Sequence, residues 1–281
     1  MLAAALLTLR EGLEAALIIS ILLSYLRQIG SQQLRWWIWA AVGAASVLSL
    51  ALAIGLRVIG AGFEGVTEQV FEGLVMLLAV GVLTWMIFWM RYQARYVKQA
   101  LEDDVHLAVQ RGQHWGLFGI AFLAVFREGV ETALFLTAAS FASDGLSIVV
   151  GSIVGLAAAV AIGWLIHAGM AGLSLRAFFN VTSALLLIFA AGLFAHGIHE
   201  LQEAGWIPII VERVWNLKPI LDDSSLVGSI LRTLVGYNDD PSLLEVISYV
   251  LYWIVVVISV RWWVERYSKV SRPPLTSSPN G

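Results

Sequence analysis

Residues 9–17 read Leu-Arg-Glu-Gly-Leu-Glu-Ala-Ala-Leu, and residues 126–134 read Phe-Arg-Glu-Gly-Val-Glu-Thr-Ala-Leu. The shared pattern, Arg-Glu-Gly-(Leu/Val)-Glu-x-Ala-Leu, begins at Arg10 and recurs 117 residues later at Arg127. Each copy lies near the middle of a long apolar stretch. An ionisable residue inside a membrane-spanning helix costs about 3 kcal/mol on insertion scales. Three such residues in each copy, placed twice by the same rule, therefore indicate a function.

The composition of this 281-residue chain is typical of a polytopic membrane protein. Hydrophobic residues make up 59% of the chain and charged residues 13%, and the mean hydropathy is +0.82. A soluble domain carries about 25% charged residues, so an ordinary soluble enzyme is excluded. The net charge of -3 gives no sign of a nucleic-acid partner. Because the chain has no cysteine, any metal site must use oxygen and nitrogen ligands.

Seven apolar stretches of roughly 20 residues or more are long enough to cross the lipid bilayer as helices. They are Leu2–Leu26, Trp36–Ile59, Val70–Met90, Trp115–Ala142, Leu146–Ala168, Phe178–His199 and Leu243–Trp263. Loops on one side carry eleven Lys and Arg residues and loops on the other side carry four, which places the N-terminus outside and the C-terminus in the cytoplasm. The predicted fold class is an all-α polytopic membrane protein with seven transmembrane helices.

The two motif copies lie in the first and fourth spans, an offset of three spans, and because this number is odd the second unit is upside down relative to the first. The sequence therefore predicts an inverted repeat of three plus three helices and one further helix. Such repeats bind substrate near the bilayer midplane, at the interface between the repeats. The predicted parts are residues 1–90 (first repeat), 91–114 (cytoplasmic loop), 115–200 (second repeat), 201–241 (external loop), 242–265 (seventh helix) and 266–281 (disordered cytoplasmic tail). Small residues such as Gly151 and Gly155 permit close helix packing.

Helical spacing places the ionisable residues of each motif on one broad face, because they are three and four residues apart. The predicted metal ligands are Glu11, Glu14, Glu128 and Glu131, and the predicted charge-tuning residues are Arg10 and Arg127. If the two helices face each other, four carboxylates meet, and the two guanidinium groups keep some of them ionised. The result is an oxygen cage with a net charge of about -2, which suits a hard, highly charged cation. The alternative, two Arg–Glu bridges that only lock the helices, leaves Glu11 and Glu128 unpaired.

The paired motifs in a seven-span chain resemble the high-affinity iron permeases of fungi and bacteria, the Ftr/EfeU type. The resemblance covers nearly the whole chain, including residues 124–132 and the stretch from Gly228 to Tyr237 before Pro241. It implies transport of Fe(III), with the glutamates of both motifs as essential iron ligands. It also implies an oxidising partner outside the membrane, either a multicopper ferroxidase or periplasmic cupredoxin-like and haem-peroxidase proteins. The short loops favour the inner membrane of a bacterium, and we expect no permanently bound cofactor.

Two further groups of residues are candidates for handling metal along the path. The candidate external access site comprises Glu64, Glu68, Glu72, His196, His199, Glu200 and Glu203. The first three are spaced to form one helical stripe. The candidate cytoplasmic exit site comprises Glu102, Asp103, Asp104 and His106. For Glu64, Glu68 and Glu72 the alternative is an acidic helix start favoured by the helix dipole. For the histidines and glutamates of the external group it is a set of polar residues at a helix end, and for the cytoplasmic group it is a solvated face. His167 is expected to be a packed histidine, and Asp222 and Asp223 receive no role.

The leading hypothesis is a permease that binds Fe(III) at the midplane glutamates and moves it inward by alternating access of the two repeats. The sequence has no nucleotide-binding motif, so the drive is a membrane potential, a proton gradient or a coupled oxidation. A second hypothesis keeps the transporter but changes the ion to Pb(II), Mn(II) or Fe(II), which carboxylates also bind. A third is an intramembrane metalloenzyme. His199 and Glu200 begin the zinc-protease pattern H-E-x-x-H, but residue 203 is glutamate, so the pattern fails.

Overall fold

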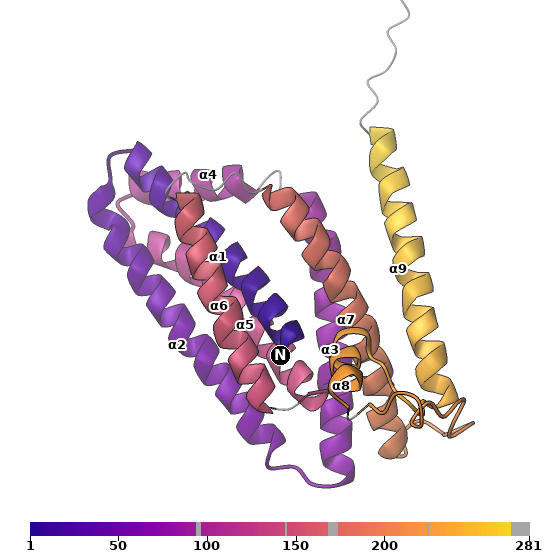
Figure 1. Cartoon of the computed structure of the whole chain (residues 1–281). Coiled ribbons are helices and arrows are strands. Elements are labelled where there is room, and N and C mark those ends of the chain that lie inside the picture. The colour runs from indigo at the N-terminus through magenta and orange to yellow at the C-terminus, as the bar shows by residue number, and fades with distance from the viewer. Residues whose placement is uncertain (94–96, 144, 168–173, 224, 271–281) are drawn as a thin grey trace, which may run out of the picture.

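The computed structural model is all-helical across the residues it describes, which are 1–270 except 94–96, 144, 168–173 and 224 (Figure 1). Seven of its helices have 23 to 29 residues. They are α1 (Leu2–Gln28), α2 (Arg35–Gly60), α3 (Val66–Gln93), α5 (His114–Phe141), α6 (Gly145–His167), α7 (Leu175–Glu203) and α9 (Leu243–Val270). At 1.5 Å per residue each is about 35–43 Å long, which is enough to cross a hydrocarbon core of about 30 Å.

Five helices in the described part of the chain are apolar enough to qualify as membrane spans by length and composition. They are Gln32–Gly60, Val66–Met90, Gly145–Leu165, Leu175–Glu203 and Leu243–Trp262. The first of these includes a short 3-10 turn, Gln32–Leu34, ahead of α2. Helices α1 and α5 have the length of a span, but each contains the three ionisable residues of one motif. Membrane crossing by these two helices stays a prediction.

Two shorter helices lie in segments that the sequence analysis treated as loops. Helix α4 (Val97–Gln110) lies within the predicted cytoplasmic loop and packs on α1 and α5 through Leu101, Val105 and Val109. Helix α8 (Leu226–Val235) lies within the predicted external loop. The Ser225 hydroxyl accepts a hydrogen bond from the Gly228 amide at the start of α8, and Gly236 ends the helix in a left-handed conformation.

The C-terminal boundary differs from the expectation. Helix α9 continues to Val270, so residues 266–270 are helical and are not part of an irregular tail. The rest of the predicted tail, residues 271–281, lies outside the described residues, as does the side chain of His167 at the end of α6.

Helices of the two predicted repeats pack against each other in a symmetric pattern. Helix α1 packs mainly against α6, α2 against α5 and α3 against α7, and α1 also contacts α5. Exchanging α1 with α5, α2 with α6 and α3 with α7 leaves this set of pairs unchanged, as a duplicated three-helix unit predicts. The corresponding helices α3 and α7 run in opposite directions, because Gln69 donates to Glu203 while Gly73 lies against Gly197. This arrangement supports the predicted inverted repeat.

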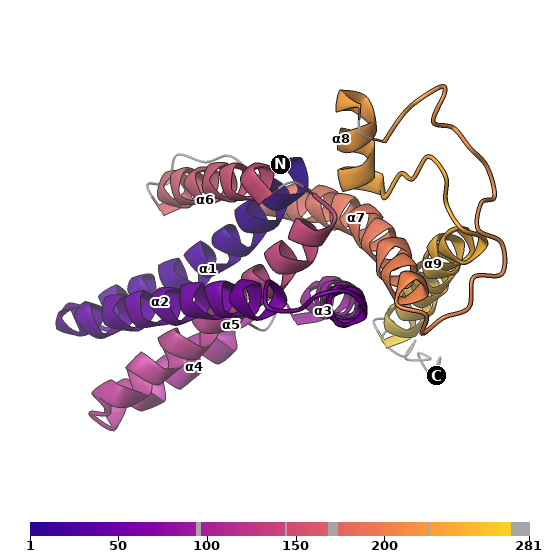
Figure 2. The same cartoon turned by 90° about the horizontal axis from the view of Figure 1, so that it is seen from below.

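The long helices form two groups (Figure 1). We call α1, α2, α5 and α6 the motif bundle, and α3, α7 and α9 the second bundle. Figure 2 shows the same separation from below, with α8 beside the second bundle. In Figure 1, α4 and the C-terminal end of α9 lie at one end of the molecule and α8 lies toward the other end. That the 91–114 segment and the C-terminal tail lie on the same side of the membrane stays a prediction.

Candidate metal-binding site

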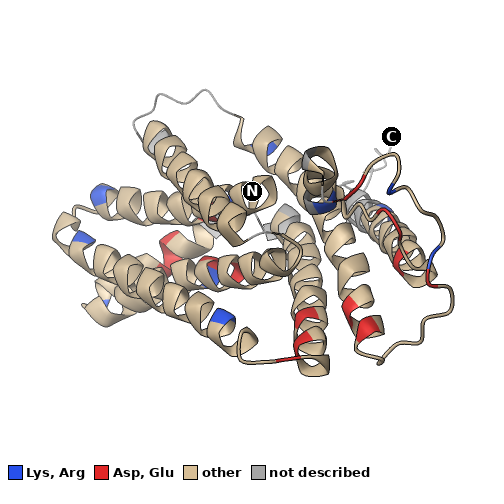
Figure 3. Ribbon diagram, turned by 60° about the horizontal axis from the view of Figure 1, so that its bottom comes forward, with Lys and Arg blue, Asp and Glu red and all other residues tan. Residues whose placement is uncertain are grey.

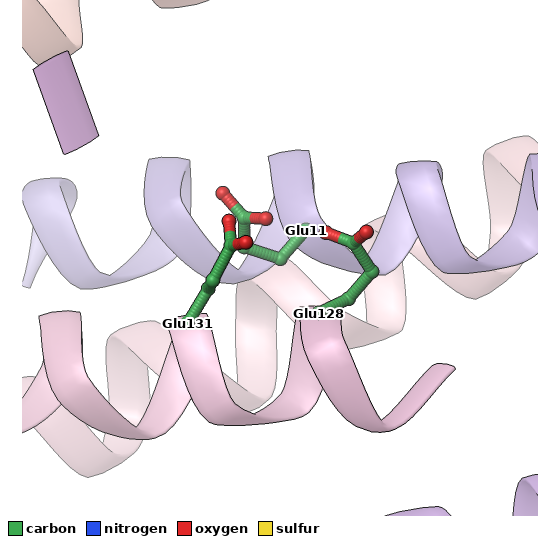
Figure 4. A group of neighbouring side chains, drawn as sticks. All are labelled: Glu11, Glu128 and Glu131. Carbon is green, nitrogen blue, oxygen red and sulfur yellow. The ribbon is translucent and has the colours of Figure 1, made fainter. Parts of the chain in front are cut away.

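Glutamates from both motifs meet where α1 and α5 pack together (Figure 4). One carboxylate oxygen from each of Glu11, Glu128 and Glu131 lies within 4.8 Å of the other two. Glu11 comes from α1, and the other two come from successive turns of α5. The three residues are buried, with exposed fractions of 1%, 6% and 9%. Three buried carboxylates at this separation are placed to share one cation.

Glu14 lies outside this three-carboxylate group. It is buried on α1, and its Oε1 atom lies 3.2 Å from Nη2 of Arg10. The sequence predicts that four carboxylates converge, and in this conformation the structure brings three of them together. Arg10 pairs with Glu14, outside the group, as well as with Glu11 inside it.

Among the described residues, each motif glutamate has a buried carboxylate oxygen without a hydrogen-bond partner. These atoms are Glu11 Oε2, Glu128 Oε2 and Glu131 Oε2, and also Glu14 Oε1, which contacts Arg10 only as an ion pair at 3.2 Å. Buried polar atoms without a partner are rare in folded proteins, because leaving them unsatisfied costs roughly 1–3 kcal/mol each. A cation bound among the carboxylates would supply the missing partner.

The two motif arginines each pair with glutamate of their own helix but differ in burial. Arg10 is 1% exposed, and its Nη1 donates to Oε1 of Glu11 at 2.9 Å. The side chain of Arg127 is 41% exposed, and its Nε donates to Oε1 of Glu131 at 2.9 Å. Glu128 forms no ion pair with either arginine within the described residues. Helix-locking bridges alone therefore do not account for the presence of Glu128.

The glycine between the glutamates lets each motif helix approach a helix of the other repeat. A Cβ atom at Gly12 would lie 2.7 Å from the Cβ of Ala159 in α6. A Cβ atom at Gly129 would overlap the hydroxyl of Ser49 in α2. Both helix contacts therefore require a residue without a side chain. Neither glycine was predicted to have a role, although both lie inside the repeated motif.

Three residues of α3 contact the motif arginines, and sequence reasoning missed them. Arg10 donates from Nη1 to Sδ of Met86 and from Nη2 to Sδ of Met90, each at 3.5 Å. The Cζ atom of Arg127 lies 4.4 Å from the ring centroid of Trp89. These contacts join the second bundle to the motif bundle. No local pattern indicates them, because they depend on how the two bundles pack.

The external acidic stripe is shorter than predicted. Helix α3 begins at Val66, so Glu64 precedes the helix, and only Glu68 and Glu72 belong to it. Gly65 has a φ of 62°, a left-handed conformation that a right-handed helix does not continue through. The prediction of one helical stripe from Glu64 onward is wrong for this reason. Glu68 is exposed, and Glu72 is partly buried.

Both histidines near the end of α7 contact other side chains of the protein through their ring nitrogens. His199 Nδ1 lies 2.9 Å from Oε1 of Glu245, and its Nε2 lies 3.2 Å from Oε1 of Glu203. Both ring nitrogens are therefore already in contact with carboxylates. His196 Nε2 lies 3.5 Å from Nη2 of Arg232, a cation that opposes metal binding there. These contacts favour the interpretation of polar residues at a helix end.

Glu245 is a further residue that the sequence analysis missed. It is buried in the first turn of α9, where it accepts hydrogen bonds from the Ser242 amide at 3.0 Å and from Asn238 Nδ2 at 2.8 Å. Together with His199 these contacts tie α9 to α7. Glu200, predicted as part of the same cluster, is partly buried next to His199. An isolated acid at the start of an apolar stretch was the signal for Glu245.

The candidate exit residues lie on α4 without forming a ligand set. Asp103, Asp104 and His106 are exposed, and Glu102 is partly buried. His106 Nε2 lies 2.8 Å from Nε2 of Gln110. Among the described residues, this group is not one of those close enough to hold a metal ion. The structure thus favours a solvated face.

A second group of three carboxylates lies in the segment between α7 and α9. It consists of Asp222, Asp223 and Asp239. Asp223 pairs with Arg232 at 3.1 Å, and its amide donates to Asp239 Oδ2 at 3.2 Å. These contacts hold the segment against α8. In Figure 3 several red acidic segments lie near helix ends and on the segment between α7 and α9, and others lie among the helices in the middle of the view.

Comparison with known proteins gives a consistent result. Residues 1–270 match the iron permease FTR1 family. The chain is 40% identical over 258 residues to the ferrous iron permease EfeU of Escherichia coli O157:H7 and to that of Shigella sonnei (strain Ss046), covering 90% of this chain and 93% of each relative. The ferrous iron permease EfeU of Yersinia pestis is 38% identical over 251 residues, covering 89% of each chain. No solved structure matches the chain significantly.

Proposed function

This chain belongs to the iron permease FTR1 family and is a multi-pass membrane iron transporter, and from that premise we propose that it imports Fe(III) through the glutamates of its two motifs. The observation that carries this proposal is the meeting of Glu11, Glu128 and Glu131 from two helices. Carboxylate oxygens are hard ligands, and an excess of negative charge favours a small trivalent cation. In the proposed site these three residues bind the ion, and Glu14 holds Arg10.

The arginines adjust the charge of the proposed site as iron comes and goes. In the empty site Arg10 and Arg127 neutralise part of the carboxylate charge, which lowers the cost of burying it. When iron binds, the oxygens of the three-carboxylate group coordinate the ion instead of pairing with the arginines. When it leaves, the arginines pair with them again. The empty site therefore buries less uncompensated negative charge.

Passage to the cytoplasm requires the helices to separate on that side. An apolar cluster of buried residues lies there between α1, α2, α4 and α5. It includes Leu22, Leu26, Val105, Leu117 and Ala121. We propose alternating access in which the helices of the two repeats move apart within the motif bundle and open this cluster, because an ion cannot cross close-packed apolar side chains.

Fe(II) is the second candidate cargo, because the relatives are named ferrous iron permeases. Carboxylates also bind divalent iron, and the residue types alone do not separate the two ions. An external oxidising partner reconciles the relatives' name with a hard site. Iron arrives as Fe(II), the partner removes one electron, and the glutamates receive Fe(III). A ferroxidase, or periplasmic iron-delivery and oxidising proteins, would fill this role.

Uptake of radiolabelled iron by proteoliposomes distinguishes the two ions. We expect chelated Fe(III) to enter faster than Fe(II) held reduced with ascorbate under anaerobic conditions, because three carboxylates attract the trivalent ion more strongly. Excess Mn(II) or Pb(II) is expected to compete weakly. Full-rate uptake of Fe(II) without an oxidant would contradict the Fe(III) proposal and establish Fe(II) as the transported ion. Strong inhibition by Pb(II) or Mn(II) would show that the site does not select iron.

A further inference from the structure

One turn of α3 contacts both motif arginines. Met86, Trp89 and Met90 lie within five consecutive residues of the second bundle, and they reach Arg10 on α1 and Arg127 on α5. Within the described residues, the ion-pair partners of each arginine are glutamates of its own motif helix. Through this turn of α3, the second bundle therefore contacts the charged residues of both motifs.

The three contacting groups are neutral, which decides what they can do. A thioether sulfur is a weak hydrogen-bond acceptor, and an indole ring attracts a guanidinium group through its π face. Neither group neutralises the positive charge of an arginine. They hold the guanidinium groups in place, while the charge stays available to the glutamates.

We propose that Met86, Trp89 and Met90 are positioning residues that hold the motif arginines beside the site when iron occupies the carboxylates. This inference rests on the proposed function. In the empty site each arginine has a carboxylate and an α3 contact. In the loaded site Glu11 and Glu131 face the ion, so Arg10 keeps Glu14 and its α3 contacts, while the Trp89 ring is the remaining described contact of Arg127. The contact therefore stabilises the loaded site more than the empty site.

The two motif arginines differ in how much they depend on the contacts with α3. Arg10 is enclosed, with two sulfurs of α3 against it. Arg127 is 41% exposed on its side chain, and the Trp89 ring is its α3 contact. Without the ring, no other described side chain of α3 is seen to keep Arg127 from turning away when Glu131 binds iron. Trp89 is therefore the position at which substitution has the larger effect.

The test is the dependence of uptake rate on iron concentration for variants of Trp89 in proteoliposomes. Trp89→Leu is expected to raise the KM for iron about three- to tenfold, the range of a partly buried cation–π contact, and to change the maximal rate per inserted chain less than about twofold. Trp89→Phe keeps an aromatic face and is expected to stay within about twofold of wild type. Trp85→Leu is the matched control, because Trp85 lies one turn away and is 69% exposed.

A second pair of variants tests the sulfur contacts. The double variant Met86→Leu, Met90→Leu keeps side-chain volume and removes both acceptors, so we expect its KM to rise in the same direction by about two- to fourfold. Met76→Leu is the control, because Met76 is buried in α3 within the apolar core, away from the arginines. A loss of folding alone lowers the amount of active protein and leaves KM unchanged.

Uptake by wild type and by Glu128→Gln in the same experiment separates this inference from the proposed function. Wild-type vesicles that take up no iron contradict the proposed function. Uptake that depends on Glu128, together with a wild-type KM in Trp89→Leu, contradicts the inference about α3 alone. A Trp89→Phe variant as impaired as Trp89→Leu also contradicts it, because the aromatic face would then play no part.

Discussion

Glu128→Gln is expected to reduce iron uptake more than about 100-fold, with the protein still present in the membrane. Glu128 belongs to the three-carboxylate group and, within the described residues, forms no ion pair with either motif arginine, so neither arginine competes directly with the cation for its carboxylate. Glutamine keeps the size of the side chain and loses that charge. Replacing even an outer partner of a metal ligand lowers metal affinity or activity about 10- to 100-fold, and loss of a ligand has a larger effect. Initial uptake of radiolabelled iron, normalised to inserted protein, measures it.

Two other variants serve as comparisons for this result. Glu14→Gln is expected to lose less of the iron uptake rate than Glu128→Gln, because Glu14 lies outside the three-carboxylate group and pairs with Arg10. Glu212→Gln is expected to transport like wild type, because Glu212 is exposed in the segment between α7 and α9. Uptake in Glu128→Gln close to that of Glu212→Gln would show that the carboxylate group is structural.

Gly155→Ala is expected to destabilise the motif bundle by about 3 kcal/mol, the upper end for overpacking. A Cβ atom at Gly155 would overlap the carbonyl oxygen of Ala5 and the hydroxyl of Thr8 in α1. A backbone carbonyl cannot rotate away as a flexible side chain can, so the two helices must move apart. Because α1 carries Glu11, that movement also disturbs the site. Thermal unfolding of the purified protein in detergent measures the loss.

The matched control for Gly155→Ala is Gly43→Ala. A Cβ atom at Gly43 in α2 meets no atom within 4 Å. Alanine also has a higher helix propensity than glycine, by about 1 kcal/mol. We therefore expect Gly43→Ala to unfold at or above the wild-type temperature. If both variants unfold at the wild-type temperature, the close contact between α1 and α6 does not support the bundle.

The motif residues could be predicted from the sequence because the pattern is local and repeated. The spacing of Arg10, Glu11 and Glu14 fixes their shared face on a helix, and the second copy extends the same argument to α5. The meeting of Glu11 with Glu128 follows once the two helices face each other. The sequence did not predict which glutamate pairs with which arginine, because only the packed structure shows that Glu14 stays with Arg10.

Boundaries and short helices were predicted less well, for identifiable reasons. The stripe from Glu64 failed because a single left-handed glycine, Gly65, precedes the helix start. The short helix α8 has a capping residue at Ser225 and a terminating Gly236, and these signals were present in the sequence. Hydropathy alone overlooks such a helix, because it is too short to span a membrane.

Contacts between the bundles could not be predicted from one sequence. Nothing in the order of residues places Trp89 against Arg127, or two methionines against Arg10, because each contact depends on the packing of distant helices. The same holds for the pairing of His199 with Glu245 across α7 and α9. That pairing changes the interpretation of His199 from a candidate ligand to a tie between helices.

The most direct test of the central claim, that glutamates of both motifs bind the transported iron together, is X-ray absorption of iron bound to the purified protein. We expect one iron per chain with oxygen ligands only, and loss of that iron in the double variant Glu11→Gln, Glu128→Gln, which removes one ligand from each motif. Full iron occupancy in the double variant, or imidazole nitrogen among the ligands, would contradict the claim.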